Sequence, residues 1–126
     1  MMKKILEPLF VESKVNFFVS GHLHAYMRTL NVIHNKPNAA GPMHIIVGNG
    51  GRQANAPFNS DIAEDWVAVR DHTTYGFSTI EYLNATTARY EWVQTGHNTL
   101  DDKGDNFLNV KKNLNDSAYV NNQYYV

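Results

Sequence analysis

The sequence contains no cysteine, only 4 prolines among its 126 residues, and no long hydrophobic run. Without cysteine, disulfide bonds and thiolate metal ligands are excluded. A membrane-spanning helix needs about 20 consecutive apolar residues, so we expect no membrane span. There is no excess of charge either, because 11 basic residues stand against 12 acidic ones and no basic run is present. This balance argues against nucleic acid as a partner.

The length and composition of the chain fit one domain of modest size. Hydrophobic residues make up 43% of the chain, which is enough for a packed core. The first residues include Lys3 and Lys4, but Glu7 and Pro8 interrupt the apolar stretch that a secretory signal requires. We therefore expect no signal peptide in this chain.

Hydrophobic periodicity predicts an α/β chain that is mostly β, with one amphipathic helix over residues 3–14. The expected strands cover residues 15–20, 26–33, 43–47, 75–83 and 87–95. The last two form a hairpin, because both alternate at period two and are joined by Asn84-Ala85-Thr86. Residues 35–42 predict a loop, and residues 52–74 an irregular segment with one helical turn over 62–66.

Two histidines stand two residues apart directly after an apolar run. Residues 15–20 predict a buried strand, and Gly21-His22-Leu23-His24 follows it at once. A buried strand that ends in glycine presents its next side chains at the carboxyl edge of a sheet, where open α/β sheets place their ligand sites. Each neutral imidazole has a nitrogen lone pair for a metal ion. The spacing therefore makes His22 and His24 candidate metal ligands.

Four segments, in order, resemble the C-terminal part of the purple acid phosphatases, which belong to the calcineurin-like metallophosphoesterases. Residues 19–29 are similar to the family motif Gly-His-x-His-x-Tyr-Glu-Arg, and residues 44–51 to its strand and Gly-Asp-Gly-Gly turn. Residues 70–77 resemble the segment Arg-Glu-x-Ser-Phe-Gly, and Tyr90-Glu91-Trp92 ends a hairpin like the family's final strands. One short motif matches by chance, but four ordered ones are specific.

The resemblance implies a fold and a domain division. The fold would be the C-terminal part of a four-layer αββα sandwich. Residues 1–105 would form the C-terminal part of the catalytic domain, and residues 106–126 an Asn-rich C-terminal tail. Two positions depart from the family pattern, since Met27 replaces its glutamate and Asn49 its aspartate. Met27 removes a charge beside the site, whereas Asn49 keeps a similar shape.

The resemblance also implies a dinuclear metal centre that hydrolyses phosphate esters. His22 would bind the divalent ion, which is Zn, Mn or Fe(II), and His24 the Fe(III). Tyr26 and Arg28 would support the ligand loop without contacting metal. In this family the two ions neutralise phosphoryl charge and lower the pKa of bound water.

Most of the family's ligands lie upstream of the residues that match this chain. The motifs Asp-x-Gly, Gly-Asp-x-x-Tyr and Gly-Asn-His-Glu are absent, and two histidines alone make a weak site. We therefore expect an acid phosphatase-like hydrolase only when the upstream half is present, and an inactive chain otherwise. The expected partners are that missing N-terminal half or a second copy of the chain.

An alternative stays open, namely a non-catalytic secreted structural or binding module derived from the same fold. By resemblance the protein would be secreted, vacuolar or lysosomal. Sequons at Asn84 and Asn115, both expected in turns, would then be candidate glycosylation sites. His44 predicts a half-buried packing residue, and His72 either a surface loop or the substrate mouth.

Overall fold

The computed structural model describes residues 2–51, 57–60, 62–97 and 113–122. Within these ranges the chain forms one helix and eight strands. The elements are α1 (Met2–Glu12), β1 (Phe17–Ser20), β2 (Tyr26–Ile33), β3 (Lys36–Pro37), β4 (Met43–Val47), β5 (Val67–Asp71), β6 (Thr74–Asn84), β7 (Thr87–His97) and β8 (Asn113–Asn121). The described helix, of 11 residues, is too short to cross a membrane.

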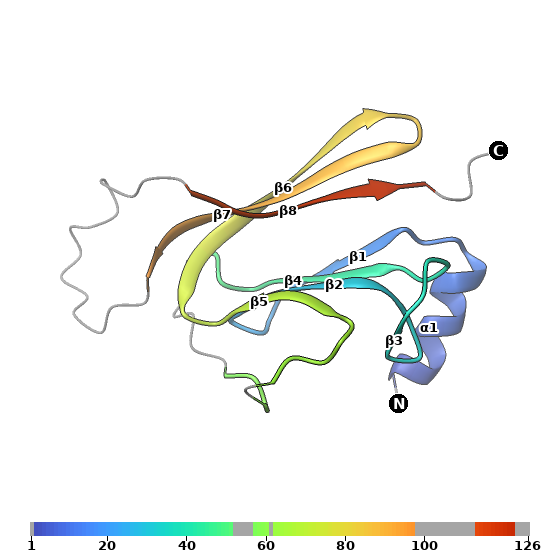
Figure 1. Ribbon diagram of the computed structural model, residues 1–126, viewed down its shortest axis with the longest axis horizontal. Helices are drawn as coiled ribbons and strands as arrows, with labels where there is room; N and C mark the ends of the chain where they lie inside the picture. The colour runs from blue at the N-terminus through green and yellow to red at the C-terminus, as the bar shows by residue number, and fades with distance from the viewer. Residues whose placement is uncertain (1, 52–56, 61, 98–112, 123–126) are drawn as a thin grey trace.

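The elements form three layers, with a helix, a five-stranded sheet and a three-stranded sheet stacked in that order (Figure 1). The larger sheet has the order β1-β4-β2-β3, and β5 also pairs with β2. β1 runs parallel to β4, and the other pairs are antiparallel. The smaller sheet has the order β6-β7-β8 and is antiparallel throughout.

The hydrophobic core lies between the two sheets. Alternation along β4 sends Met43 and Ile45 into this core, where they meet Tyr90 and Trp92 of β7. The ring of Tyr26 stacks on Trp92 with centroids 4.1 Å apart and planes 2° from parallel. The start of β2 is thereby fixed against the smaller sheet, which matters because β2 directly follows the histidine loop.

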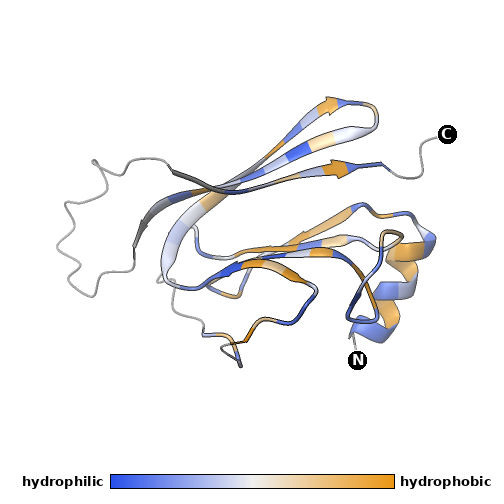
Figure 2. Cartoon of the chain, viewed as in Figure 1, coloured by the Kyte–Doolittle hydropathy of each residue, from blue (hydrophilic) through white to orange (hydrophobic). Residues whose placement is uncertain are grey.

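Helix α1 covers the opposite face of the larger sheet. The hydrophobic and hydrophilic bands of the helix are visible in Figure 2, as the amphipathic pattern predicts. The ring of Phe10 packs against Phe18 and His44, with centroids 5.0 and 6.4 Å away. Glu7 accepts a hydrogen bond from the backbone N–H of His34 at 3.0 Å, and its carboxylate lies 2.6 Å from the Nδ1 of His34. The helix is therefore held to the hairpin turn after β2.

The predicted helix, the strands at residues 26–33 and 43–47, and the hairpin are confirmed. Several other predictions were wrong. The loop predicted over residues 35–42 contains the short strand β3. The segment 52–74 contains the strand β5, and residues 62–66 form bends and turns instead of a helical turn. Residues 15–20 were expected to form a buried strand, but in the strand found there, β1, Phe18 and Val19 are 37% and 45% exposed. The reason is position, since β1 is the edge strand of the described sheet.

The C-terminal region also differs from the expectation of a tail. Residues 113–121 form β8, which pairs with β7 from Thr87↔Asn121 onward. The proposed boundary at residue 105 lies outside the described residues. The sequon at Asn84 is in the β6–β7 turn as predicted, but Asn115 lies within β8, so the expected turn there was wrong.

Candidate functional site

The two candidate ligands each occupy the centre of a three-residue turn. The N–H of Leu23 donates to the carbonyl of Gly21 at 3.0 Å, and the N–H of Ala25 donates to the carbonyl of Leu23 at 2.7 Å. These are consecutive γ-turns, the first centred on His22 and the second on His24. His22 has φ 73°, the value of the rare and strained γ-turn form. Strain of this kind costs about 1–3 kcal/mol and gathers at functional sites.

The histidine loop rests directly on the turn that follows β4. The N–H of Gly48 donates to the carbonyl of Ala25 at 3.0 Å. A Cβ added at Gly48 would lie only 1.7 Å from the carbonyl oxygen of Leu23. No side chain fits there, so this glycine is required by the close approach of two backbones. The position of the loop is therefore set by β4 as well as by β1.

Asn49 ties this turn to the smaller sheet. The residue is fully buried, and its Nδ2 donates to the carbonyl of Thr74 at 2.7 Å. Its own carbonyl accepts a hydrogen bond from the N–H of Gly76 at 3.2 Å. An amide donor suits this position, because a carboxylate would face the Thr74 carbonyl without a hydrogen to share. Through these two bonds Asn49 joins the turn after β4 to the start of β6.

Tyr26 and Arg28 share one partner, Asp116 of β8. The hydroxyl of Tyr26 donates to Oδ2 of Asp116 at 2.5 Å. The guanidinium of Arg28 donates from Nε to Oδ2 at 2.6 Å and from the other side of its fork to Oδ1 at 2.8 Å. The side chains of Arg28 and Asp116 are only 11% and 6% exposed. This is a buried, two-pronged ion pair with an added phenol donor.

The surroundings of this cluster keep Arg28 charged and Tyr26 neutral. The hydrogen bond to Asp116 raises the pKa of Arg28, so the guanidinium stays charged. Burial raises the pKa of Tyr26 far above its usual range, with the hydrogen bond to Asp116 adding to the effect. Tyr26 is therefore a neutral hydrogen-bond donor.

Met27 lies between Tyr26 and Arg28 on β2, and its side chain is on the opposite face of the larger sheet. Met27 lines the groove on the helix side of the larger sheet together with Ser20, His44 and Ile46. His44 is half-buried there, as predicted, and burial lowers its pKa. The position where the family has glutamate therefore faces the α1 side, away from Asp116.

His72 lies near the same sheet end, because the register places Asp71 beside Tyr26. It lines a pocket of about 400 Å³ with Phe58, Arg70 and others, and its ring meets Phe58 edge-on at 5.6 Å. Arg70 stacks over the same Phe58 ring, 4.8 Å from its centroid. The two residues thus share one aromatic neighbour.

The described part of the chain supplies two imidazoles to this edge, and it contains no group of three or more His, Cys, Asp or Glu side chains that could hold a metal ion. Closed metal sites in proteins use at least three or four ligands. His22 and His24 alone therefore do not complete a metal site within the described residues.

Asp116 is the residue that sequence reasoning missed as part of this site. A signal was present, because Asp116, Ala118 and Val120 alternate at period two and face inward, while Ser117 and Tyr119 are exposed. A carboxylate on the apolar face of a strand needs a buried cationic partner. The sequence does not identify that partner, which in the structure is Arg28, 88 residues earlier in the chain.

The comparisons with known proteins agree on one family. Residues 41–103 match the family model described as "Iron/zinc purple acid phosphatase-like protein C". Purple acid phosphatase 18 of Arabidopsis thaliana is 35% identical over 88 residues, covering 69% of this chain and 20% of that protein. Phosphoenolpyruvate phosphatase of Allium cepa is 36% identical over 103 residues, covering 72% and 21%.

Some relatives match nearly the whole chain. Purple acid phosphatase 19 of Arabidopsis thaliana is 28% identical, with 99% of this chain and 33% of that protein covered. The chain thus spans about a fifth to a third of the length of these relatives. On the family model and on relatives above 30% identity, this chain belongs to the purple acid phosphatase family.

Proposed function

We propose that this chain is the C-terminal part of a metal-dependent phosphate ester hydrolase, with His22 binding a divalent ion and His24 binding Fe(III). The observation that carries the proposal is the pair of γ-turns, which centres both histidines on one loop at the carboxyl end of β1. Family membership adds the expectation of two metals. The divalent ion would be Zn, Mn or Fe(II).

The remaining ligands must come from outside the described residues. When bound, a dinuclear centre polarises a phosphate ester and generates a hydroxide nucleophile near neutral pH. This chain's own contribution would be to orient two imidazoles. Tyr26 and Arg28 would support the loop through Asp116, to which both donate hydrogen bonds.

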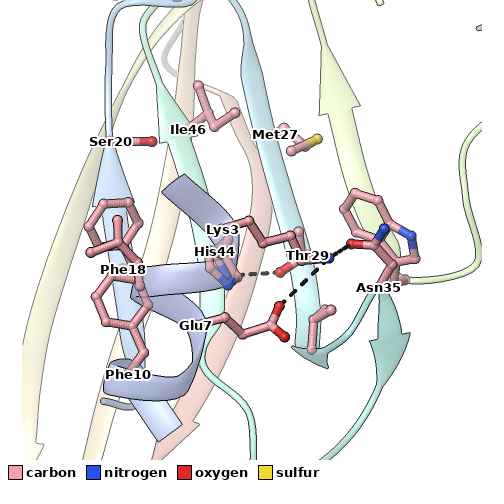
Figure 3. Close-up of a pocket in the computed structure, with 13 residues that line it drawn as sticks. Lys3, Glu7, Phe10, Phe18, Ser20, Met27, Thr29, Asn35, His44 and Ile46 are labelled. Carbon is pink, nitrogen blue, oxygen red and sulfur yellow. Dashed lines mark hydrogen bonds and ion pairs between the residues drawn. The ribbon is translucent and has the colours of Figure 1, made fainter. Parts of the chain in front are cut away.

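The upstream half of the fold would cover the exposed side of the larger sheet. Between α1 and this sheet lies a groove of about 320 Å³. In Figure 3 the helix residues Lys3, Glu7 and Phe10 lie over one end of the sheet, and Ser20, Ile46 and Met27 lie beyond them. We propose that upstream strands pair with the outer edge of β1 and that upstream helices fill this groove. Residues 1–105 would then belong to a four-layer αββα sandwich.

The proposed location is secreted, vacuolar or lysosomal, which makes glycosylation of Asn84 relevant. Asn84 is exposed at the tip of the β6–β7 hairpin. Its side-chain oxygen accepts hydrogen bonds from the N–H and the hydroxyl of Thr86, at 2.9 and 2.8 Å. This turn presents the sequon to solvent, whereas Asn115 lies within β8, at the irregularity in the β7–β8 register between Leu114 and Asp116. A mass shift on glycosidase treatment that is lost in Asn84→Gln would support the assignment.

The functional proposal is tested by substitution of the histidines. His22→Ala and His24→Ala should each lower metal content and hydrolysis of p-nitrophenyl phosphate by orders of magnitude in the protein as the cell makes it. His34→Ala is a matched control, because His34 also has positive φ but lies at the opposite end of β2. Unchanged metal content and turnover in both loop variants would contradict the proposal.

A second candidate is a non-catalytic binding or structural module. It is favoured by the two-ligand site and by the exposed edge strand β1. An exposed edge pairs with another chain unless it is covered. This candidate predicts a metal-free protein that forms dimers through β1, and sedimentation would detect the dimer. A stable monomer carrying two metal ions would exclude it.

A further inference from the structure

Asp116 binds two side chains that are distant from it in the sequence and lie just after the histidine loop. Its carboxylate accepts from Tyr26 and Arg28, which precede it by 90 and 88 residues. Tyr26 and Arg28 lie at the start of β2 in the larger sheet, and Asp116 lies in β8 of the smaller one. The cluster is therefore a polar clamp between the two sheets.

A buried clamp of this kind is a costly way to gain stability. Charges taken out of water lose their hydration, and an apolar cluster of similar volume is often as stable or more so. What the clamp adds is geometry, because a forked guanidinium and a phenol fix both oxygens of one carboxylate in direction and distance. The main effect of this cluster is therefore to hold β2 in place.

The residue held most closely is the one next to the loop. Tyr26 has no exposed surface, is stacked on Trp92 and is bonded to Asp116. Ala25, just before it, donates to the carbonyl of Leu23 to close the γ-turn of His24, and accepts from the N–H of Gly48. A shift of Tyr26 would thus be passed directly to the turn that orients His24.

We infer that Asp116 is a positioning residue for the His22–His24 loop, acting through Tyr26 and Arg28. The inference deepens the proposed function, because the loop matters chemically only when it binds metal. The positioning itself is a property of the chain alone, however, and is measurable without any metal. It also assigns a role to β8, in the region predicted to be a C-terminal tail.

The test compares Asp116→Asn with a matched control on this 126-residue chain. Asparagine keeps the shape of the side chain and removes its charge. The control is Glu81→Gln, which removes the carboxylate of an exposed pair with Arg89 at the same distance of 2.6 Å. Amide hydrogen exchange, followed by NMR, gives a separate rate for each N–H group.

The expected result is local. In Asp116→Asn the amides of Ala25 and Gly48 should exchange at least about 10-fold faster than in the control, because both bonds depend on the position of Tyr26. The amide of Val15, which donates to Phe10 at the end of α1, should not change. Unchanged rates at Ala25 and Gly48, or an equal increase at Val15, would overturn the inference, since the clamp would then have only a global effect or none.

A milder variant covers the case in which Asp116→Asn does not fold. Tyr26→Phe removes one donor and keeps the stack on Trp92. It should raise the exchange rate of Ala25 several-fold and leave Val15 unchanged. Equal rates at both positions would overturn the inference in the same way.

A Co²⁺ titration separates the inference from the function on which it rests. If the wild type binds Co²⁺, Asp116→Asn should bind it about 10–100-fold more weakly, as loss of a supporting residue does at other metal sites, and Glu81→Gln should match the wild type. Equal affinity of the three would overturn the positioning role toward metal. If neither His22→Ala nor His24→Ala changes Co²⁺ binding, the proposed function fails, while the exchange rates still decide the positioning role.

Discussion

Gly48 is the position where a single methyl group should displace the candidate metal loop. In Gly48→Ala the new Cβ would lie 1.7 Å from the carbonyl oxygen and 2.6 Å from the carbonyl carbon of Leu23. Both are backbone atoms, so no side-chain rotation relieves the clash. Ordinary contacts begin at 3.4 Å, so the loop must retreat by about 1.7 Å. The hydrogen bond from Gly48 to Ala25 cannot survive that shift.

The energetic cost follows from overpacking. Adding a methyl group to a well-packed site costs about 1–3 kcal/mol, and the upper part of that range applies because backbone meets backbone. For a chain of this length, a loss of about 2–3 kcal/mol lowers the Tm by roughly 6–12 °C. A displacement of about 1.7 Å at a metal-ligand loop is also large relative to the tolerance of such sites, which is about 0.5 Å.

The neighbouring glycines supply the control. A Cβ at Gly51 meets no atom of the described residues within 4 Å, and one at Gly50 makes an ordinary contact of 3.8 Å with Gly76. Gly51→Ala should therefore leave the Tm and Co²⁺ affinity unchanged, whereas Gly48→Ala lowers both. Calorimetry and a Co²⁺ titration measure the two effects. Equal behaviour of the two variants would refute the idea that the loop is seated on Gly48.

Three other changes test separate parts of the account. His22→Gly should be about 1 kcal/mol more stable than His22→Ala, because φ 73° is strained for any residue with a Cβ. Both variants should lose metal. Equal denaturant midpoints for the two variants would contradict the strain. Burial lowers the pKa of His44 below its ordinary value of 6.5. The charge of Glu7 opposes this effect, and the charge of Lys3 reinforces it. The unfolded chain then binds more protons, so this part of the stability is present above pH 6.5 and lost as the pH falls below it. His44→Phe should flatten that slope in urea titrations, and an unchanged slope would exclude His44 as its source. Asn49→Ala removes a buried hydrogen bond and should cost about 1–3 kcal/mol in the same assay, whereas a cost near zero would show that the turn does not need it.

The local elements could be predicted because their signals are local. Strands β2 and β4 and the hairpin carry alternation that one segment reveals by itself. The same holds for the His-x-His pair, whose spacing and preceding apolar run are contiguous. β5 was missed because its five residues follow a long irregular stretch and include Arg70 and Asp71, which read as polar loop.

The clamp could not be predicted, because it depends on two sheets being stacked. Nothing near Tyr26 or Arg28 in sequence indicates that their partner is Asp116, in the third strand of the other sheet. The Asn-rich surroundings of Asp116 are typical of a solvated tail. The γ-turn at His22 likewise could not be predicted, since glycine and not histidine is the residue that usually indicates positive φ.

The central claim is that His22 and His24 are ligands of a dinuclear iron-containing centre, and metal content tests it most directly. The protein as the cell makes it would be dialysed extensively and measured by elemental mass spectrometry beside its His22→Ala and His24→Ala variants. The account predicts two metal ions per molecule, one of them iron, and a loss of metal in both variants. A protein without metal, or one whose metal is unaffected by both substitutions, would contradict it.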